Sequence, residues 1–252
     1  LEATATYEKQ MNEHHFKWLL GSSVENANDK YLSGGRNTFP NNNLYELSAG
    51  SSATASNGSS LSEYALMSFF TRLNYSWKER YLLEGNLRYD GSSRFAPGHR
   101  WGLFPSVSAG WRITEESFFK NSNLTKAIDN LKLRVSYGVL GNQNIGYYPY
   151  QQTYSLGQDA PLGSPASLQS GVNMSVYNNP DISWEKTAVT DFGLDFGLFH
   201  NTLIGTIDYF YKYTSDILAP VEVTSLIGRG VGQSNVGAVS NKGIELSLSY
   251  NG

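Results

Sequence analysis

The stretch "YLLEGNLRYDGSSRF", residues 81 to 95, decides the fold class because its side chains alternate in character with a period of two. The odd positions are mostly apolar or aromatic: Tyr81, Leu83, Gly85, Leu87 and Tyr89. The even positions after Leu82 are polar or charged: Glu84, Asn86, Arg88 and Asp90. Successive side chains of a β-strand point to opposite faces. The stretch therefore predicts a strand with an apolar environment on one side and water on the other.

The same alternation recurs along almost the whole chain, whereas helical periodicity is nearly absent. Nine candidate strands centre on residues 1–7, 16–20, 61–77, 81–94, 101–113, 131–137, 184–198, 203–213 and 244–250. We expect most of them to be about 10 to 16 residues long, whereas strands of soluble sandwiches are usually about 5 to 6 residues long. A strand that crosses a membrane needs about 9 to 11 residues. Strand length therefore favours a transmembrane sheet.

The connections between the strands alternate between short and long. Short links are expected at residues 11–13, 78–80 and 200–201. Long segments rich in Gly, Asn and Ser are expected at residues 28–60, 142–182 and 217–235. Short turns at one end and long loops at the other are typical of outer-membrane barrels. We therefore predict an all-β, antiparallel up-and-down transmembrane β-barrel.

Two connections depart from this pattern. The link at residues 95–100 is short where a long loop is expected, and the link at residues 114–130 is long where a short turn is expected. The second link has room for a helical turn. An antiparallel meander still requires residues 114–130 to lie at the same end as the short links.

Composition excludes several other classes of protein. The chain has 252 residues, a net charge of −3 and no cysteine, so it has neither a basic field for nucleic acid nor a disulfide or thiolate metal site. No run approaches the length of a transmembrane helix. His14 and His15 point to opposite faces of a strand and cannot chelate a metal together. We expect no metal, no cofactor and no nucleic-acid partner.

The 17 Tyr and five Trp residues suggest two aromatic girdles, because such rings collect at membrane–water interfaces. The residues expected at the level of the short turns are Tyr7, Trp77, Tyr81, Trp111 and Tyr250. The residues expected nearer the long loops are Tyr89, Trp101, Trp184 and Tyr213. A soluble sandwich would instead bury these rings in its core.

The other face of the sheet is predicted to line the lumen. The lumen-facing polar residues are expected to include Arg72, Glu84, Asn86, Arg88, Asp90, Arg112, Asp191 and Asp195. We expect Glu84 to lie opposite Arg112. Asp90 and Arg94 lie too far apart on one strand to pair, so each is expected to find partners on neighbouring strands or on a plug.

Some of these acidic residues invite a different interpretation. Two carboxylates are the minimum for glycoside hydrolysis, and the available ones are Glu84, Asp90, Glu185, Asp191, Asp195 and Asp208. They lie on different strands with no evident apolar pocket to raise the pKa of one of them. Hydrated groups paired with basic residues are the better interpretation, and we predict that the protein is not an enzyme.

The loop "NIGYYPYQQTYSLG" is the candidate ligand site. It concentrates Tyr147, Tyr148, Tyr150 and Tyr154 at the end with the long loops. A Tyr ring offers a flat apolar face and a hydroxyl, which suit sugar rings and extended peptides. Packing among loop neighbours explains the same cluster equally well.

Four segments carry a resemblance to a known family. They are "RYDGSSRFAPGHRWGLFPSVSAGWRITEE" (88–116), "LKLRVSYGVLGNQNIGYYPYQQTY" (131–154), "NPDISWEKTAVTDFGLDFGLF" (179–199) and "NVGAVSNKGIELSLSY" (235–250). In order and spacing they resemble the SusC/RagA family of TonB-linked outer-membrane transporters, mostly over the second half of the family's barrel. The first 60 residues are less distinctive.

The resemblance implies a 22-stranded barrel, an N-terminal plug inside it, a TonB box before the plug, and a SusD-like surface lipoprotein over its mouth. Residues 1–252 would then be about nine strands of that barrel, with the plug and the TonB box outside this chain. We expect the first and last strands to present unpaired edges.

The expected function is TonB-dependent uptake of large nutrients across the Gram-negative outer membrane. Glycans or oligosaccharides are the first expectation for the cargo and peptides the second, with outer-membrane lipid around the barrel. Contact with the TonB complex would come through the N-terminal region. A soluble β-sandwich that binds carbohydrate, and a porin or adhesin without a plug, remain alternatives.

Overall fold

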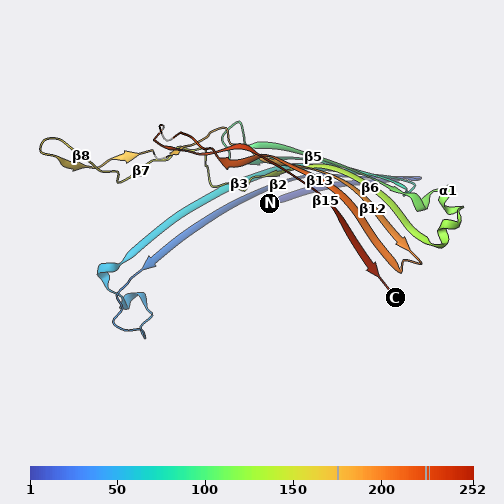
Figure 1. Cartoon of the computed structure of the whole chain (residues 1–252), viewed down its shortest axis with the longest axis horizontal. Coiled ribbons are helices and arrows are strands. Elements are labelled where there is room, and N and C mark those ends of the chain that lie inside the picture. The colour runs from blue at the N-terminus through green and yellow to red at the C-terminus, as the bar shows by residue number, and fades with distance from the viewer. Residues whose placement is uncertain (175, 225, 227) are drawn as a thin grey trace.

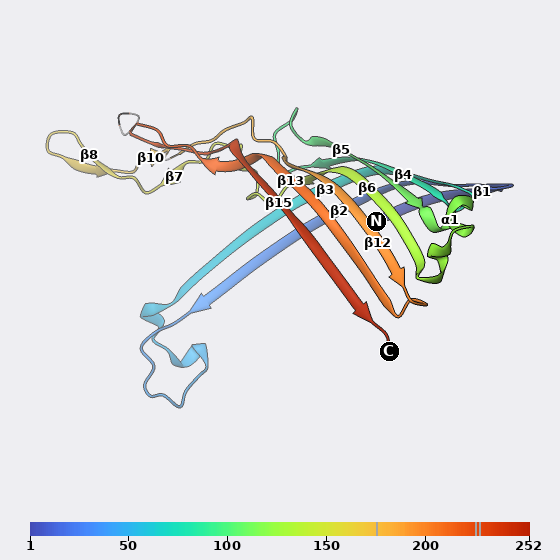
Figure 2. The same ribbon diagram turned by 45° about the vertical axis from the view of Figure 1, so that its right-hand side comes forward.

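A computed structural model describes residues 1–174, 176–224, 226 and 228–252. Its main feature is one nine-stranded antiparallel sheet, which curves as an open arch (Figure 1 and Figure 2). The strands, in spatial order, are β1 (Glu2–Met11), β2 (His14–Gly35), β3 (Ser56–Trp77), β4 (Tyr81–Ser92), β5 (Trp101–Arg112), β6 (Ile128–Asn142), β12 (Glu185–Leu198), β13 (Leu203–Pro220) and β15 (Gln233–Tyr250). Neighbours in space follow one another along the chain, so the predicted meander is confirmed.

The remaining elements are short and lie in the connections. The helical ones are η1 (Leu47–Ala49), η2 (Ser52–Thr54), η3 (Ile113–Glu115), α1 (Ser117–Lys120) and η4 (Asn123–Lys126). Three two-stranded sheets pair β7 (Ser155–Leu156) with β10 (Val172–Asn173), β8 (Ala160–Leu162) with β9 (Ser167–Gln169), and β11 (Val176–Tyr177) with β14 (Gly230–Val231). Within the described residues, no helix combines the length and the apolar character needed to span a membrane.

The register of the strands sorts the side chains onto two faces. One row across five strand pairs is apolar: Tyr75, Leu83, Ala109, Val135, Phe192 and Tyr209. The next row, on the opposite face, is polar: Asn74, Glu84, Ser108, Ser136 and Asp191. Large apolar side chains such as Leu83 and Leu87 remain more than 40% exposed. The apolar face is therefore a continuous surface that the described residues leave uncovered.

The strands β2 and β3 are longer than the sequence pattern predicts. The segment 28–60, expected as a loop, is largely a paired ladder that reaches Gly35 and begins again at Ser56. The pair extends well beyond its neighbours to the segment 36–55 (Figure 1). Beyond the apolar zone both faces of a strand meet water, so the apolar alternation stops although the backbone pairing continues.

The two outer strands have one partner each. Among the described residues, β1 pairs only with β2 and β15 pairs only with β13. The expectation of two open edges is confirmed. A row of unpaired backbone groups at a sheet edge is a template for another strand.

The small buried core lies on the polar face and corrects the prediction for Trp184. This cluster consists of Phe95, Phe104, Ile182 and Trp184. The side chain of Trp184 is only 5% exposed. Phe104 pairs with Arg88, which places the cluster on the polar side. Trp184 precedes β12, where the chain leaves the sheet, so strand alternation does not determine its direction. Its indole Nε1 donates to the carbonyl oxygen of Arg100 at 2.9 Å.

Five of the other aromatics lie at the expected ends of the apolar face. Trp77 pairs with Tyr81 and Tyr81 with Trp111 in one row at the short-turn end. Near the other end Trp101 stacks on Tyr89, with ring centroids 4.6 Å apart. The two levels are confirmed for these five residues, whereas the levels of Tyr7, Tyr213 and Tyr250 stay predictions.

Candidate functional site

Arg134 on β6 is the centre of the best-connected charged group on the polar face. Its Nε lies 2.8 Å from Oδ1 of Asp195 on β12, and its terminal nitrogen lies 2.7 Å from Oδ1 of Asp208 on β13. Lys132 adds a longer contact of 3.8 Å to Asp195. The register brings these residues together, because Gly193 of β12 lies between Arg134 and Asp208 in one row and Asp195 is two residues further along β12. One guanidinium thus joins three strands.

A second group joins β3, β4 and β5. Nε of Arg72 donates to Oδ1 of Asn86 at 2.6 Å, and the amide nitrogen of Asn86 donates to Glu84 at 2.8 Å. The same amide contacts the hydroxyl of Ser106 at 3.2 Å. Arg72 also approaches Glu84 at 3.9 Å. Neutral Asn86 therefore bridges opposite charges on adjacent strands.

The register between β4 and β5 corrects the predicted partner of Glu84. Glu84 lies opposite Ser108, whereas Arg112 lies beyond the end of β4 and reaches Glu79 of the turn at 4.0 Å. The error is four residues, an even number, so the predicted face was right and the partner wrong. Strand parity alone does not fix the register of a hairpin.

The structure corrects the expectation that Asp90 pairs with a neighbouring strand, because its ion-pair partner among the described residues is on its own strand. Nη2 of Arg88 lies 3.1 Å from Oδ1 of Asp90, two residues along β4. Residues two apart share a face, and a long Arg side chain can fold along the strand to its neighbour. Asp90 is 9% exposed and lies beside the aromatic core, where an ion pair within one strand needs no other element.

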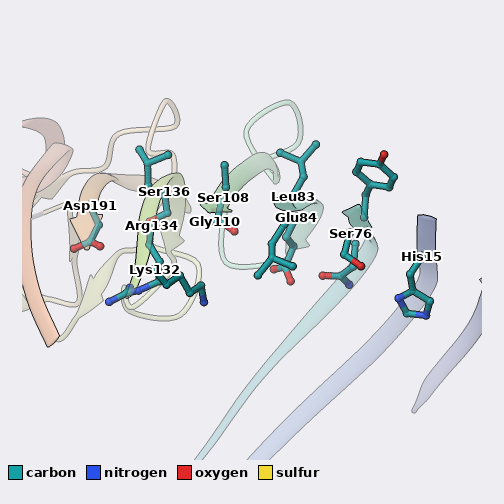
Figure 3. A pocket seen from close by; sticks show the side chains of 15 residues that line it. His15, Ser76, Leu83, Glu84, Ser108, Gly110, Lys132, Arg134, Ser136 and Asp191 are labelled. Atoms are coloured by element: carbon teal, nitrogen blue, oxygen red, sulfur yellow. The ribbon is translucent and has the colours of Figure 1, made fainter. Parts of the chain in front are cut away.

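A hollow on the polar face separates the two charged groups. The hollow is surrounded by charged residues and one histidine: Glu84, Lys132, Arg134, Asp191 and His15. The small residues between them are Ser76, Ser108, Gly110 and Ser136. Figure 3 shows the polar side chains projecting to one side of the strands and Leu83 to the other. The small residues of β5 leave room between longer charged neighbours. The hollow offers both donors and acceptors to a polar partner, but the described residues contain no group of three or more potential metal ligands.

The candidate tyrosine loop is held against the long β2–β3 hairpin. The guanidinium of Arg94 packs against two neighbouring rings, 4.3 Å from the centroid of Tyr64 and 5.0 Å from that of Tyr147. The Tyr147 hydroxyl donates to Asp29 on β2 at 3.1 Å. The terminal nitrogen of Arg94 also donates to the backbone carbonyl of Ile145. Arg94 thus finds partners on another strand and on a loop, which agrees with the expectation.

The four tyrosines of the loop are not equivalent. Tyr148 and Tyr150 contact each other edge to face at 6.3 Å, directly after the clamped Tyr147. Tyr154 lies further along the chain and is 63% exposed. The structure therefore brings together Tyr147, Tyr148 and Tyr150 more closely than it does Tyr154. Sequence reasoning missed Tyr64 and Asp29, since nothing local to them signals a contact with residues 83 and 118 positions away.

We expect loss of the Arg94 guanidinium to loosen this loop. In an Arg94→Leu variant, amide hydrogen exchange over residues 143–150 should become about tenfold faster, since a desolvated cation–π contact contributes about 1 to 2 kcal/mol. Arg36→Leu is the matched control, because Arg36 binds the carbonyls of Ser48 and Gly50 in a different loop. Equal exchange over residues 143–150 in both variants would contradict the clamp.

A second unpredicted contact lies at the short-turn end. Oε1 of Glu116 accepts hydrogen bonds from the Tyr81 hydroxyl at 2.6 Å and the Trp111 indole at 3.1 Å. Oε2 lies 3.3 Å from the guanidinium of Arg80. The hydrogen bonds from Tyr81 and Trp111, together with the charge of Arg80, hold the pKa of Glu116 below its ordinary value. Glu116 is therefore ionised at neutral pH.

Comparison with known proteins agrees with this architecture. A family model described as "TonB dependent receptor-like, beta-barrel" matches residues 3–251. TonB-dependent receptor SusC of Bacteroides thetaiotaomicron is 37% identical over 191 residues, which cover 73% of this chain and 18% of that protein. TonB-dependent receptor P39 of Formosa agariphila is 32% identical over 259 residues, which cover 96% of this chain and 23% of that protein.

A solved structure shows the same arrangement of strands. The RagAB peptide importer in its "closed-closed" state matches with a TM-score of 0.84 and 31% identity over 99% of this chain and 27% of that one. The chain also spans only 18% to 24% of the length of the curated relatives it matches.

Proposed function

The chain belongs to the TonB-dependent receptor β-barrel family of the outer membrane, and from that premise we propose that it forms barrel wall and extracellular loops of an importer of large nutrients. One observation carries this proposal: the sheet has a bare apolar face and, opposite it, a face of linked charges. A lipid-embedded barrel with a hydrated interior needs both. A soluble sandwich would cover the apolar face with a second sheet.

The polar face is proposed to line the lumen and to receive a plug. The inner wall would then include three arginines, Arg72, Arg88 and Arg112. It would also include the acidic residues of the two charged groups and of the hollow. A plug needs hydrogen bonds that can exchange with water when it moves, and the hollow beside Arg134 offers donors and acceptors of that kind. All of residues 1–252 are assigned to the barrel domain, with the plug and the TonB box in other parts of the polypeptide.

The cargo is proposed to be an oligosaccharide or a peptide, bound in part by Tyr147, Tyr148, Tyr150 and Tyr154. The resemblance to the SusC/RagA family supports an oligosaccharide, and the similarity to the RagAB peptide importer supports a peptide. A SusD-like lipoprotein is proposed as the partner at the mouth, and the TonB complex as the partner in the periplasm. Stacking and hydrogen bonding are enough for capture and release, so the proposal includes no bond-breaking step and no cofactor.

Binding by the full-length protein tests the tyrosine loop. The probe is the mixture of oligosaccharides or peptides that the unmodified receptor captures. We expect Tyr148→Ala and Tyr150→Ala each to raise the dissociation constant for this mixture about tenfold, or about 1.4 kcal/mol. Tyr45→Ala is the control, because Tyr45 is 85% exposed in the separate loop 36–55. Equal affinity of all three variants would remove the loop from the ligand site.

Uptake measurements distinguish an energised importer from a porin or an adhesin. We expect cells with a functional TonB complex to accumulate the cargo, and cells without the complex to bind it at their surface but to accumulate none of it; an adhesin would accumulate none in either case. Accumulation that continues without TonB would indicate a passive pore.

A further inference from the structure

Among the described residues, the connection between β5 and β6 is the one connection at the short-turn end that contains helical elements. The links after β1, β3 and β12 are tight turns, whereas residues 113–126 contain η3, α1 and η4. In outer-membrane barrels the short-turn end faces the periplasm. A folded segment of this length at that end therefore needs a reason.

Glu116 fastens this segment to the apolar face of the sheet. Tyr81 and Trp111, its two hydrogen-bond donors, belong to the apolar row that continues to Leu133. Rings at a membrane boundary usually turn their O–H and N–H groups to water. Here one carboxylate, whose side chain is only 12% exposed, satisfies both groups. The segment is thus held at the level of the aromatic girdle.

Two neighbouring phenylalanines then point in different directions. Phe119 is 4% exposed and packs into the protein, whereas Phe118 is 62% exposed. Consecutive residues of a helical turn are about 100° apart, so burying one ring turns the other away from the protein. Leu124 in η4 is also more than half exposed. Large apolar side chains at this level are unfavourable in water and favourable at the boundary between lipid headgroups and acyl chains.

We propose that residues 113–126 form an interfacial anchor that inserts Phe118 and Leu124 into the phospholipid leaflet on the periplasmic side. Glu116 is the positioning residue, because it ties the segment to lipid-facing Tyr81 and Trp111. Lys120 and Lys126 bring positive charge to the phosphate layer, with Lys120 also held by Glu115 at 2.6 Å. The anchor continues the apolar surface of the barrel wall past the ends of β5 and β6.

Fluorescence quenching tests the position of the anchor. The full-length receptor, with any other cysteine removed, is placed in vesicles of phosphatidylethanolamine and phosphatidylglycerol and labelled with an environment-sensitive dye at Phe118→Cys. We expect lipids with a doxyl group near the glycerol backbone to quench this label at least about twofold more than a label at Asn12→Cys in the β1–β2 turn. Equal quenching at the two positions would overturn the proposal.

The role of Glu116 has its own matched pair of variants. In the Phe118→Cys protein, Glu116→Ala should reduce quenching to the level of the Asn12 label, because the tie to Tyr81 and Trp111 is lost. Glu115→Ala should leave quenching unchanged, because Glu115 contacts Lys120 and not the girdle. Unchanged quenching in Glu116→Ala would refute the positioning role. If that variant does not insert, the comparison of Phe118 with Asn12 still decides whether the anchor exists.

Discussion

Leu83→Arg and Leu87→Arg are each expected to lower the free energy of unfolding of the full-length receptor in lipid by about 2 to 4 kcal/mol. Both side chains stand on the apolar face of β4, between the aromatic rings of Tyr81 and Tyr89. A guanidinium there has to be taken out of water or has to deform the bilayer to stay hydrated. Denaturant titrations of folding into phospholipid vesicles measure the cost.

The structure also shows which control is fair. Asn86 faces the polar side, but Arg in its place would lose the contacts with Arg72 and Glu84 and add a like charge beside Arg72. Ser108 is the better control, because it lines the hollow directly opposite Glu84. We expect Ser108→Arg to cost less than about 1 kcal/mol. Leu83→Ala separates the loss of the leucine from the cost of the charge.

Equal costs at Leu83 and Ser108 would mean that the two faces do not distinguish lipid from lumen. The membrane-spanning role of this sheet would then be wrong. A large cost at Leu83 together with a small cost at Ser108 supports it, since protein stability in water alone gives no reason for such a difference.

The sequence predicts the faces of the strands well because parity depends only on local backbone geometry. In each strand from β3 to β6 the alternating apolar residues share one face, and exceptions such as Phe70 and Phe104 pair with Arg88 on the polar face. The predicted partner of Glu84 was wrong because the register of β4 against β5 depends on how many residues form the β4–β5 loop. Strand ends were wrong for β2 and β3, since the ladder continues where the apolar signal ends.

The tertiary contacts of the loops were not predictable in the same way. Arg94 and Tyr147 meet only because two loops fold over the polar face, and Trp184 becomes buried for the same reason. Glu116 belongs to a connection whose helical turn was anticipated, but its contact with Tyr81 requires the chain to fold back on the girdle. Composition located the tyrosine-rich loop without indicating which of its rings would be held in place.

The second large effect is expected from Arg134, whose loss should destabilise the receptor by about 2 to 3 kcal/mol because hydrogen bonds to charged groups are involved. In an Arg134→Met variant, Asp195 and Asp208 keep their negative charges on the polar face without the guanidinium between them. Their desolvation is then poorly compensated and they repel each other. Arg134→Lys should recover part of the loss, since an ammonium can approach one carboxylate but cannot span both as the planar fork does.

Lys132→Met is the matched control, because Lys132 lies on the same strand but makes only the 3.8 Å contact with Asp195. We expect it to cost less than about 1 kcal/mol. Adding Asp208→Asn to Arg134→Met should restore part of the free energy of unfolding by removing one of the two like charges.

If Arg134→Met lowers the free energy of unfolding no more than Lys132→Met does, the contacts of Arg134 do not hold β6, β12 and β13 together. If the cost is large and Asp208→Asn relieves part of it, the guanidinium of Arg134 stabilises the sheet by offsetting the repulsion between the carboxylates of Asp195 and Asp208 while it contacts both.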